Sequence, residues 1–525
     1  MTKTWADLPD PVTGRSDGLV MSFVARALPL RSRRLRLLAG VLVPMLMAGC
    51  SVGPDFSKPA APEVTGYTAH PLPATIVGAD VAGGSAQRFV KAGDIPADWW
   101  MLFHSRQLND LIERSLASNP DLKAAQAALT VAHENVLAQR GAYYPAVSAG
   151  FAASREKDPP GSLAPVPSNN AFLYNLFTPQ LSISYAPDVF GLNRRTVESL
   201  KAQEASVHFQ MLAAQITLTA NVVAAAIQQA SLQAQIDATH QLVDINTRMV
   251  GILRYQLAKG YVGQLEVSAQ ESQLAQVNAT LPPLLRQLAQ QNDLIAVLAG
   301  RFPSEAPDQQ FDLSSLRLPQ QLPLSLPSAL VAQRPDVLQA QANMHAASAQ
   351  VGIATANRLP NIALTANAGS TALAIGQVFK AGTGFWNLGA AITAPIFQGG
   401  TLLHQERAAK ANYVQTAEQY RSTVLTAFQN VADTLVALQQ DGAGLKTTAD
   451  AADAARVTLE LSQRQSRDGY ANYLSVLSAE QAWQQARIAL VQAQATRYLD
   501  TAALFQALGG GWWNRTDSIQ DNDGK

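Results

Sequence analysis

The chain has 525 residues, and its 39 basic and 39 acidic side chains give a net charge of zero. Charged residues make up 15% of the chain, below the about 25% of typical soluble domains. A neutral chain offers no electrostatic basis for binding nucleic acid. Cys50 is the only cysteine, so the chain cannot hold a disulfide framework.

The N-terminal segment has the features of a secretory signal. Four arginines between positions 31 and 36 precede an apolar run over 37–47, and Ala48-Gly49-Cys50 follows. A basic segment, a short apolar segment and a small-residue cleavage site form this signal, and the run is too short to span a bilayer. We predict that residues 1–49 are the signal peptide, with Met21 as an alternative start.

Cys50 lies where cleavage is expected. Leu46-Met47-Ala48-Gly49-Cys50 resembles the bacterial lipoprotein box, with Met47 where leucine is usual. The resemblance implies that Cys50 is acylated and becomes the first residue of the mature protein. Ser51 follows, and not the aspartate associated with inner-membrane retention, which indicates the outer membrane. Residues 50–98, rich in Pro, Ala and Gly, are predicted to form a lipidated extended arm.

The mature chain contains two copies of one unit. Asn119-Pro120-Asp121 reappears 215 positions later as Arg334-Pro335-Asp336, and Gly260-Tyr261 reappears 209 positions later as Gly469-Tyr470. A nearly constant offset of this kind indicates an internal repeat. We predict a first repeat over residues 99–310, a linker over 311–333, a second repeat over 334–510 and a polar tail over 511–525.

Each copy contains one very long predicted helix. No proline occurs between Pro187 and Pro282, and apolar residues recur every three or four positions. We predict helices over 193–258 and 401–467, each roughly 100 Å long at 1.5 Å per residue. Such a helix requires side-by-side packing with others. We interpret the polar residues along the first helix as excluding a membrane span; they are Arg194, Arg195, Lys201, Glu204, Gln228 and Asp237.

Four segments alternate between apolar and polar residues as strands do. They cover about 145–154, 179–187, 360–369 and 385–394, each long enough to cross a bilayer when tilted. The polar face is the predicted lumen lining of a pore: Ser182, Ser184, Asn361, Thr365, Asn367 and Asn387. The alternative is an ordinary half-buried antiparallel sheet. Four strands cannot close a membrane barrel, so the pore requires a trimer with 12 strands.

Several motifs in a fixed order carry a family resemblance that covers essentially the whole mature chain. They are the lipoprotein box, Asp98-Trp99-Trp100, Leu108-Asn109-Asp110-Leu111-Ile112, Asn119-Pro120-Asp121-Leu122, Ala394-Pro395-Ile396-Phe397 and the run from Gly469 to Leu477. The chain resembles the TolC-type outer-membrane efflux factors, and most closely their lipidated OprM-like members. The resemblance implies a mixed, mainly α fold. It implies a homotrimeric duct with a 12-stranded β-barrel in the outer membrane and a 12-helix α-barrel in the periplasm.

The same resemblance implies function and partners. The duct is passive and serves a drug or toxic-compound efflux pump. An inner-membrane pump of the resistance-nodulation-division type supplies energy through a periplasmic adaptor. No cofactor is expected beyond the lipid on Cys50.

Further residues are implied by matching the family motifs. The adaptor-docking tips are Gly260, Tyr261, Val262, Gly263, Gly469 and Asn472. The gate at the periplasmic tip is Tyr470, Leu474 and Glu266, together with Ser478, where OprM-like members place an aspartate. The alternative for the two tyrosines is plain coiled-coil packing.

Three other functions are conceivable for such a chain. An enzyme is disfavoured because the chain has no G-x-S-x-G, H-E-x-x-H, C-x-x-C or Walker motif, and its seven histidines lack metal-ligand spacing. A periplasmic coiled-coil scaffold without a pore is disfavoured by the four alternating strands. Within the duct interpretation, the outer-membrane component of a type I secretion system is the alternative, and neighbouring genes would decide it.

Overall fold

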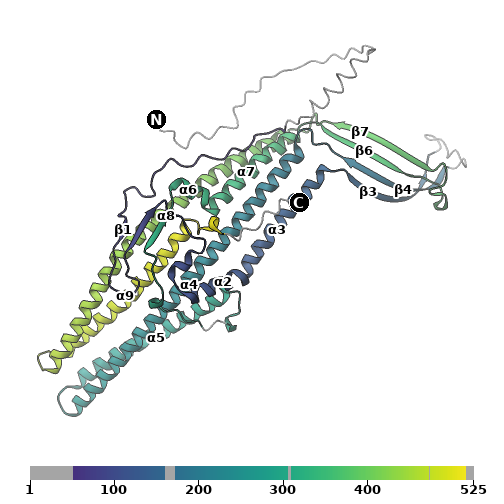
Figure 1. Cartoon of the computed structure of the whole chain (residues 1–525). Helices are drawn as coiled ribbons and strands as arrows, with labels where there is room; N and C mark the ends of the chain where they lie inside the picture. Colours follow the sequence, from purple (N-terminus) through teal and green to yellow (C-terminus); the bar gives the residue numbers. More distant parts are fainter. Residues whose placement is uncertain (1–50, 160–171, 306–308, 472, 516–525) are drawn as a thin grey trace. The chain divides into compact units, whose positions relative to one another are not determined.

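The computed structural model describes residues 51–159, 172–305, 309–471 and 473–515 (Figure 1). Cys50, Asn472 and most of the predicted C-terminal tail therefore lie outside the described residues. The chain divides into two units, each described here by itself. The strand unit comprises residues up to 59, 129–206 and 340–420, and the helical unit comprises residues 60–128, 207–339 and 421 onward.

The strand unit contains one four-stranded antiparallel sheet. Its strands are β3 (Ala146–Lys157), β4 (Leu173–Tyr185), β6 (Asn361–Ser370) and β7 (Gly384–Thr393), in the order β3-β4-β6-β7. The short 3-10 helices η2 (Gly141–Tyr143) and η5 (Ile375–Gln377) flank the strands. Strand β3 pairs with β4, and β6 pairs with β7, along its whole length, whereas β4 pairs with β6 only over residues 180–185. Figure 1 shows the four strands as one extended ribbon.

The first hairpin of this sheet is longer than the alternation predicted. Strand β3 continues to Lys157 and β4 already begins at Leu173, because backbone pairing persists after the apolar alternation ends, with Glu156 opposite Tyr174. Pro179 lies inside β4. The register between β4 and β6 stops beside it, at Gln180 and Gly369, so the amide that proline lacks falls where this ladder ends.

The helical unit combines helices with a small three-stranded sheet. The helices that lie wholly in this unit are α2 (Arg106–Ser118), α5 (Gln264–Leu298), α6 (Pro327–Gln333) and α9 (Tyr473–Ala507). The sheet has the order β1 (Thr75–Ile76), β2 (Gln87–Lys91), β5 (Gln321–Leu324). Four 3-10 turns complete it: η1 (Trp99–Phe103), η3 (Pro303–Glu305), η4 (Leu313–Ser315) and η6 (Trp512–Asn514).

The two tryptophans that end the N-terminal arm belong to the core of the helical unit. Trp99 is buried and stacks on Phe505 of α9, with ring centroids 5.1 Å apart. Phe103 and Tyr498 lie beside this pair and are also buried. A fully buried aromatic side chain contributes about 1.5–3 kcal/mol through the apolar surface it removes from water. These contacts attach the arm to α9.

Four helices contribute residues to both units: α3 (Pro120–Arg140), α4 (Leu192–Ala258), α7 (Pro335–Ala356) and α8 (Thr401–Arg467). Helices α4 and α8 each have 67 residues, and α5 and α9 each have 35. Glycines with positive φ precede both long helices, Gly191 at 79° and Gly400 at 87°. These glycines allow the sharp turn into each helix at no steric cost.

The polar residues of the first long helix do not interrupt every long apolar run in it, contrary to the expectation. Between Glu204 and Asp237 the helix has no acidic or basic residue apart from His208. By length and composition alone, α4 would pass for a membrane span. More than half of its most apolar window is buried inside the protein, however, with Val223, Ala226 and Ile227 fully buried. Packing against other helices therefore accounts for its apolar character.

Candidate channel surfaces

The sheet of the strand unit has one polar face. Directly opposite residues of antiparallel strands point to the same face. The register places Ser182 opposite Asn367, and Asn367 opposite Asn387, whose Oδ1 accepts a 2.9 Å hydrogen bond from Asn367 Nδ2. The next row joins Ser184 to Thr365, and Asn361 begins β6 opposite Thr393. The six predicted lumen residues thus share one face of one sheet.

The opposite face is apolar and exposed. The register aligns Leu181 with Ala368 and Trp386, and Ile183 with Ala366 and Leu388. Trp386 and Leu388 are each 75% exposed in the single chain. A contiguous exposed surface of large apolar side chains indicates contact with lipid or protein rather than water. The alternation of the two faces is the pattern of a barrel strand with lipid outside and water inside.

The sheet is open at both edges. Within the described residues, β3 pairs only with β4, and β7 pairs only with β6. Each therefore leaves one row of backbone amides and carbonyls without a strand partner. Such groups are not tolerated in a bilayer, where no water is present to satisfy them. A membrane location requires further strands at both edges.

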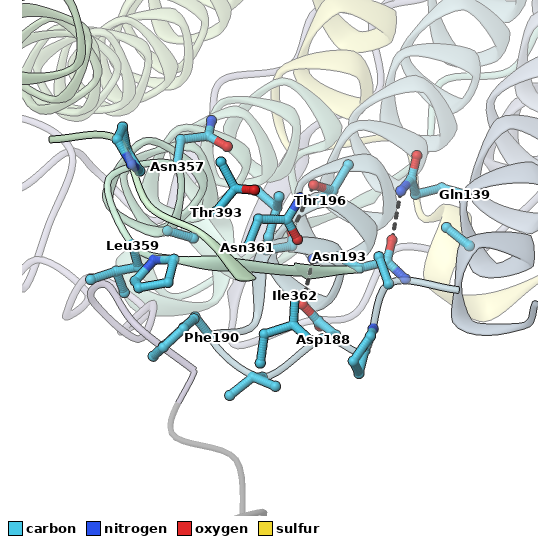
Figure 2. Close-up of a pocket in the computed structure, with 18 of the residues that line it drawn as sticks. Gln139, Asp188, Phe190, Asn193, Thr196, Asn357, Leu359, Asn361, Ile362 and Thr393 are labelled. Atoms are coloured by element: carbon cyan, nitrogen blue, oxygen red, sulfur yellow. Dashed lines mark hydrogen bonds between the residues drawn. The ribbon is translucent and has the colours of Figure 1, made fainter. Parts of the chain in front are cut away.

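A cavity of about 620 Å³, lined by both apolar and polar side chains, lies where the strands give way to the long helices (Figure 2). Asn361 and Thr393 contribute to its lining from the ends of β6 and β7. Asp188 accepts hydrogen bonds from the backbone amides of Asn193 and Arg194, at 2.9 and 2.8 Å, and so caps α4. The Gln139 amide donates to Asn193 Oδ1 at 2.6 Å. Amide side chains therefore continue the polar face of the sheet beyond the strand ends.

The turn between α4 and α5 is the first predicted tip. Gly260 has φ 74°, and the amide of Tyr261 donates back to the Gln256 carbonyl at 2.9 Å, which closes the end of α4. Glu266 Oε2 accepts a 3.0 Å hydrogen bond from the Gly263 amide. In the single chain this predicted gate residue therefore caps the start of α5. The Tyr261 side chain is 78% exposed.

The turn between α8 and α9 repeats this geometry. Gly469 has φ 78°, and the Tyr470 amide donates to the Gln465 carbonyl at 2.8 Å. Tyr470 is 87% exposed and Leu474 63% exposed, and Ser478 is also exposed. In the described residues, no hydrogen bond or ion pair joins Glu266 to these side chains. The predicted gate residues are thus presented at two tips and are not in contact within one chain.

The segment immediately after Cys50 is held by Arg195 near the start of α4. The buried guanidinium donates to the Val52 carbonyl at 3.1 Å and to the carboxylates of Asp55 and Glu198, both at 2.7 Å. Burial alone would lower the pKa of Arg195, but these hydrogen bonds outweigh it and raise the pKa above its ordinary value. The Val52 amide also donates to the Phe190 carbonyl at 3.2 Å.

Sequence reasoning did not single out three of the buried polar residues. Arg195 was read only as a charge on a helix, and Arg497 was not considered. The Arg497 side chain is fully buried and donates to the carbonyls of Val77 and Ser85, which attaches the arm to α9. Glu480, which is 1% exposed, was not identified either. One feature of the sequence could have revealed these residues: each is a charged side chain at a position where the helix otherwise has apolar residues.

The described residues contain no group of three or more His, Cys, Asp or Glu side chains that could hold a metal ion. Hydroxyl and amide side chains line one face of the sheet described above.

Comparison with known proteins identifies the family. The model of the outer membrane efflux protein family matches residues 111–301 and 326–510. The probable efflux pump outer membrane protein TtgC of Pseudomonas putida is 29% identical over 483 residues, covering 91% of this chain and 96% of that protein. The outer-membrane channel OprN is 25% identical, with a TM-score of 0.77 over 88% of this chain and 100% of OprN.

A second solved structure, the outer membrane protein VceC from Vibrio cholerae, is 27% identical with a TM-score of 0.73, over 79% of this chain and 99% of VceC. The fold, mainly helical with a few strands, is therefore that of known outer-membrane channels. The chain belongs to the outer membrane efflux protein family, and it is an efflux channel of the outer membrane.

Proposed function

We propose that three copies of this chain form one continuous duct, with a 12-stranded β-barrel in the outer membrane and a 12-helix α-barrel in the periplasm. The observation that carries this proposal is the four-stranded sheet with one apolar face, one polar face and two unpaired edges. Three such sheets joined edge to edge satisfy every backbone group and enclose a polar lumen. Ser182, Ser184, Asn361, Thr365, Asn367 and Asn387 then line the lumen.

The test compares neighbouring residues of one strand. In a Cys50→Ser background, Ser182→Cys and Leu181→Cys each carry one thiol, on opposite faces of β4. A charged thiol reagent that cannot cross membranes should label Cys at 182 in intact outer membrane and leave Cys at 181 unlabelled. Equal labelling at both positions would contradict the barrel. Cross-linking of the purified protein should give a trimer, and a stable monomer in detergent would contradict the assembly.

The duct is passive and is closed at its periplasmic end by Tyr470, Leu474 and Glu266, with Ser478 beside them. An inner-membrane pump of the resistance-nodulation-division type supplies the energy. A periplasmic adaptor docks on the tips, at Gly260, Tyr261, Val262, Gly263, Gly469 and Asn472. The exposure of Tyr261 and Tyr470 in the single chain supports this arrangement, because partner surfaces favour aromatic side chains.

Cys50 carries the lipid, residues 1–49 form the signal peptide and residues 50–98 form the arm. The contacts of Arg195 with Val52 and Asp55 support attachment of the segment after Cys50 to the start of α4. The two repeats span residues 99–310 and 334–510, with the linker 311–333 between them. The substrates are drugs or small toxic compounds, as the names of two Pseudomonas putida relatives suggest: the antibiotic efflux pump protein ArpC and the toluene efflux pump protein TtgC.

A further inference from the structure

A buried carboxyl group lies where α4, α5 and α9 meet. Glu480 of α9 is 1% exposed, and its Oε1 accepts a 3.1 Å hydrogen bond from Asn246 Nδ2 of α4. Gln270 of α5 donates to Asn246 Oδ1 at 2.7 Å. Asn246 and Gln270 are fully buried. These three residues, the Glu480 cluster, link the first helical hairpin (α4 and α5) to the second (α8 and α9).

The Glu480 cluster contains no cation. Among the described residues, no Lys, Arg or His forms an ion pair with Glu480. The nearby charged residues either contact other side chains or are exposed. Glu271 pairs with Arg254 at the surface, at 2.7 Å, and Arg487 lies over the Trp483 ring at 5.4 Å. The other charged residues on the nearby turns of α4 and α8 are exposed: Asp244, Arg248, Asp453, Arg456 and Glu460. On α8, the side that packs here is apolar and includes Leu459, which contacts Val476 and Ala479.

The hydrogen bonds of the cluster favour a neutral acid. Glu480 Oε2 and Gln270 Oε1 are both buried acceptors without a hydrogen-bond partner in the described structure. A proton on Oε2 would convert that atom into a donor, whereas an ionised carboxylate would leave a charge buried without a counter-ion. Burial raises the pKa of Glu480 to about 7, although the nearby amide of Gln270 acts in the opposite direction.

We propose that protonated Glu480 locks the second hairpin to the first, and that ionisation of Glu480 releases this lock near the periplasmic tips. The packed state binds the proton more tightly than a state in which Glu480 meets water. The lock is therefore complete below the ordinary pKa of about 4.5 and is lost as the pH rises through about 7. Its effect on channel opening rests on the proposed tip gate, but the lock itself does not.

The repeat supplies a matched control. Glu271 occupies the position 209 residues before Glu480, but it is partly exposed and paired with Arg254. Glu480→Gln keeps the side-chain shape and removes the charge, so it should fix the lock in the closed state at every pH. Glu271→Gln removes the carboxylate at the equivalent position of the first hairpin and leaves the three residues of the Glu480 cluster unchanged.

The experiment measures hydrogen exchange of peptides covering 474–486 in the full-length protein, corrected for the intrinsic dependence of exchange on pH. Between about pH 5.5 and 8, protection in the wild-type protein and in Glu271→Gln should fall about tenfold or more. Protection in Glu480→Gln should stay constant. A wild-type protein with pH-independent protection, or a Glu480→Gln variant with the wild-type pH dependence, would overturn the lock.

Conductance in a planar bilayer separates the lock from the gate. If exchange shows the lock opening with pH while wild-type conductance stays constant, the coupling of the lock to the tip gate is refuted and the lock stands. A conductance that rises with pH in the wild-type protein, and not in Glu480→Gln, supports both.

Discussion

The guanidinium of Arg334 donates a 2.7 Å hydrogen bond to the carbonyl of Ala507, at the last residue of α9. The first repeat contains the same link in different chemistry, because Asn119 Nδ2 donates to the carbonyl of Leu298 at the end of α5, at 3.1 Å. Arg334 lies 215 positions after Asn119, and Ala507 lies 209 positions after Leu298. In each repeat, the residue directly before one helix (α3 or α7) thus binds the last carbonyl of another (α5 or α9).

Replacement of Arg334 by methionine should destabilise the helical unit more than loss of the equivalent asparagine. Arg334→Met leaves the Ala507 carbonyl unpaired and removes the partner of Asp336, at a cost of about 2–3 kcal/mol. Asn119→Ala removes a cap worth about 1–2 kcal/mol. The check is the temperature at which the heat-modifiable oligomer converts to monomer on a gel. An equal shift for both variants would contradict this ranking.

Arginine should be tolerated on one face of the sheet only. Leu181→Arg or Leu364→Arg on the apolar face should cost roughly 2–4 kcal/mol near the bilayer midplane, whereas Ser182→Arg on the polar face should cost little. Folded protein recovered in outer-membrane fractions is the measurement. Equal yields for Leu181→Arg and Ser182→Arg would rule out a bilayer around these strands.

Replacement of Cys50, the proposed acylation site, should separate lipidation from membrane location. Cys50→Ser should abolish incorporation of a labelled fatty acid, and much of the protein should still sediment with the outer membrane, because the barrel anchors it independently. Acyl chains contribute about 0.8 kcal/mol of membrane-binding free energy per buried CH₂, but a barrel remains in the membrane without this contribution. Label that persists in the variant would show that the lipid is attached elsewhere.

Removal of the predicted gate side chains should open the resting channel. Tyr470→Ala combined with Leu474→Ala should raise single-channel conductance. Each contact that closes the tip contributes only about 1 kcal/mol, and few such contacts remain in the double variant. Tyr261→Ala, at the equivalent position of the first hairpin, is the matched control and should leave conductance unchanged. A double variant that conducts no better than the wild type would place the gate elsewhere.

A second carboxyl group, that of half-buried Asp441 on α8, makes stability depend on pH. Burial, together with the nearby carboxyl of Asp500, raises the pKa of Asp441 to about 7, although Arg497 acts in the opposite direction. Its contribution to stability is therefore fully present below its ordinary pKa and is lost as the pH rises through about 7. Asp441→Asn should raise the unfolding temperature by a few degrees above neutral pH and leave it unchanged near pH 4. A benefit that is equal at both pH values would contradict this assignment.

The sequence predicts the long elements well and the polar contacts between them poorly. Helix α4 begins one residue before the predicted start and α8 coincides with its predicted range, because Gly191 and Gly400 mark their starts in the sequence. The ends of β3 and β4 were missed, since backbone pairing continues after the apolar alternation stops. The lumen face could be read from alternation alone, because a strand has a period of two.

The buried polar residues show that sequence periodicity does not predict contacts between residues far apart in the chain. Arg195 contacts Asp55 across 140 positions, and Glu480 contacts Asn246 across 234. No local period relates such partners, so an arginine or a glutamate on a helix looks the same whether it faces water or closes a buried cluster. The two tip turns were predictable for the opposite reason, since their hydrogen bonds join residues only five positions apart.

The equal lengths of α4 and α8, and of α5 and α9, restrict how this protein can evolve. Deleting one residue from a single long helix would rotate everything beyond it by about 100° and withdraw it by 1.5 Å, so the apolar seam would turn away from its neighbours. The same deletion in only one repeat would also leave its tip out of step with the other. Substitutions can therefore accumulate along the helices, whereas insertions and deletions should be confined to the arm, the strand loops and the linker.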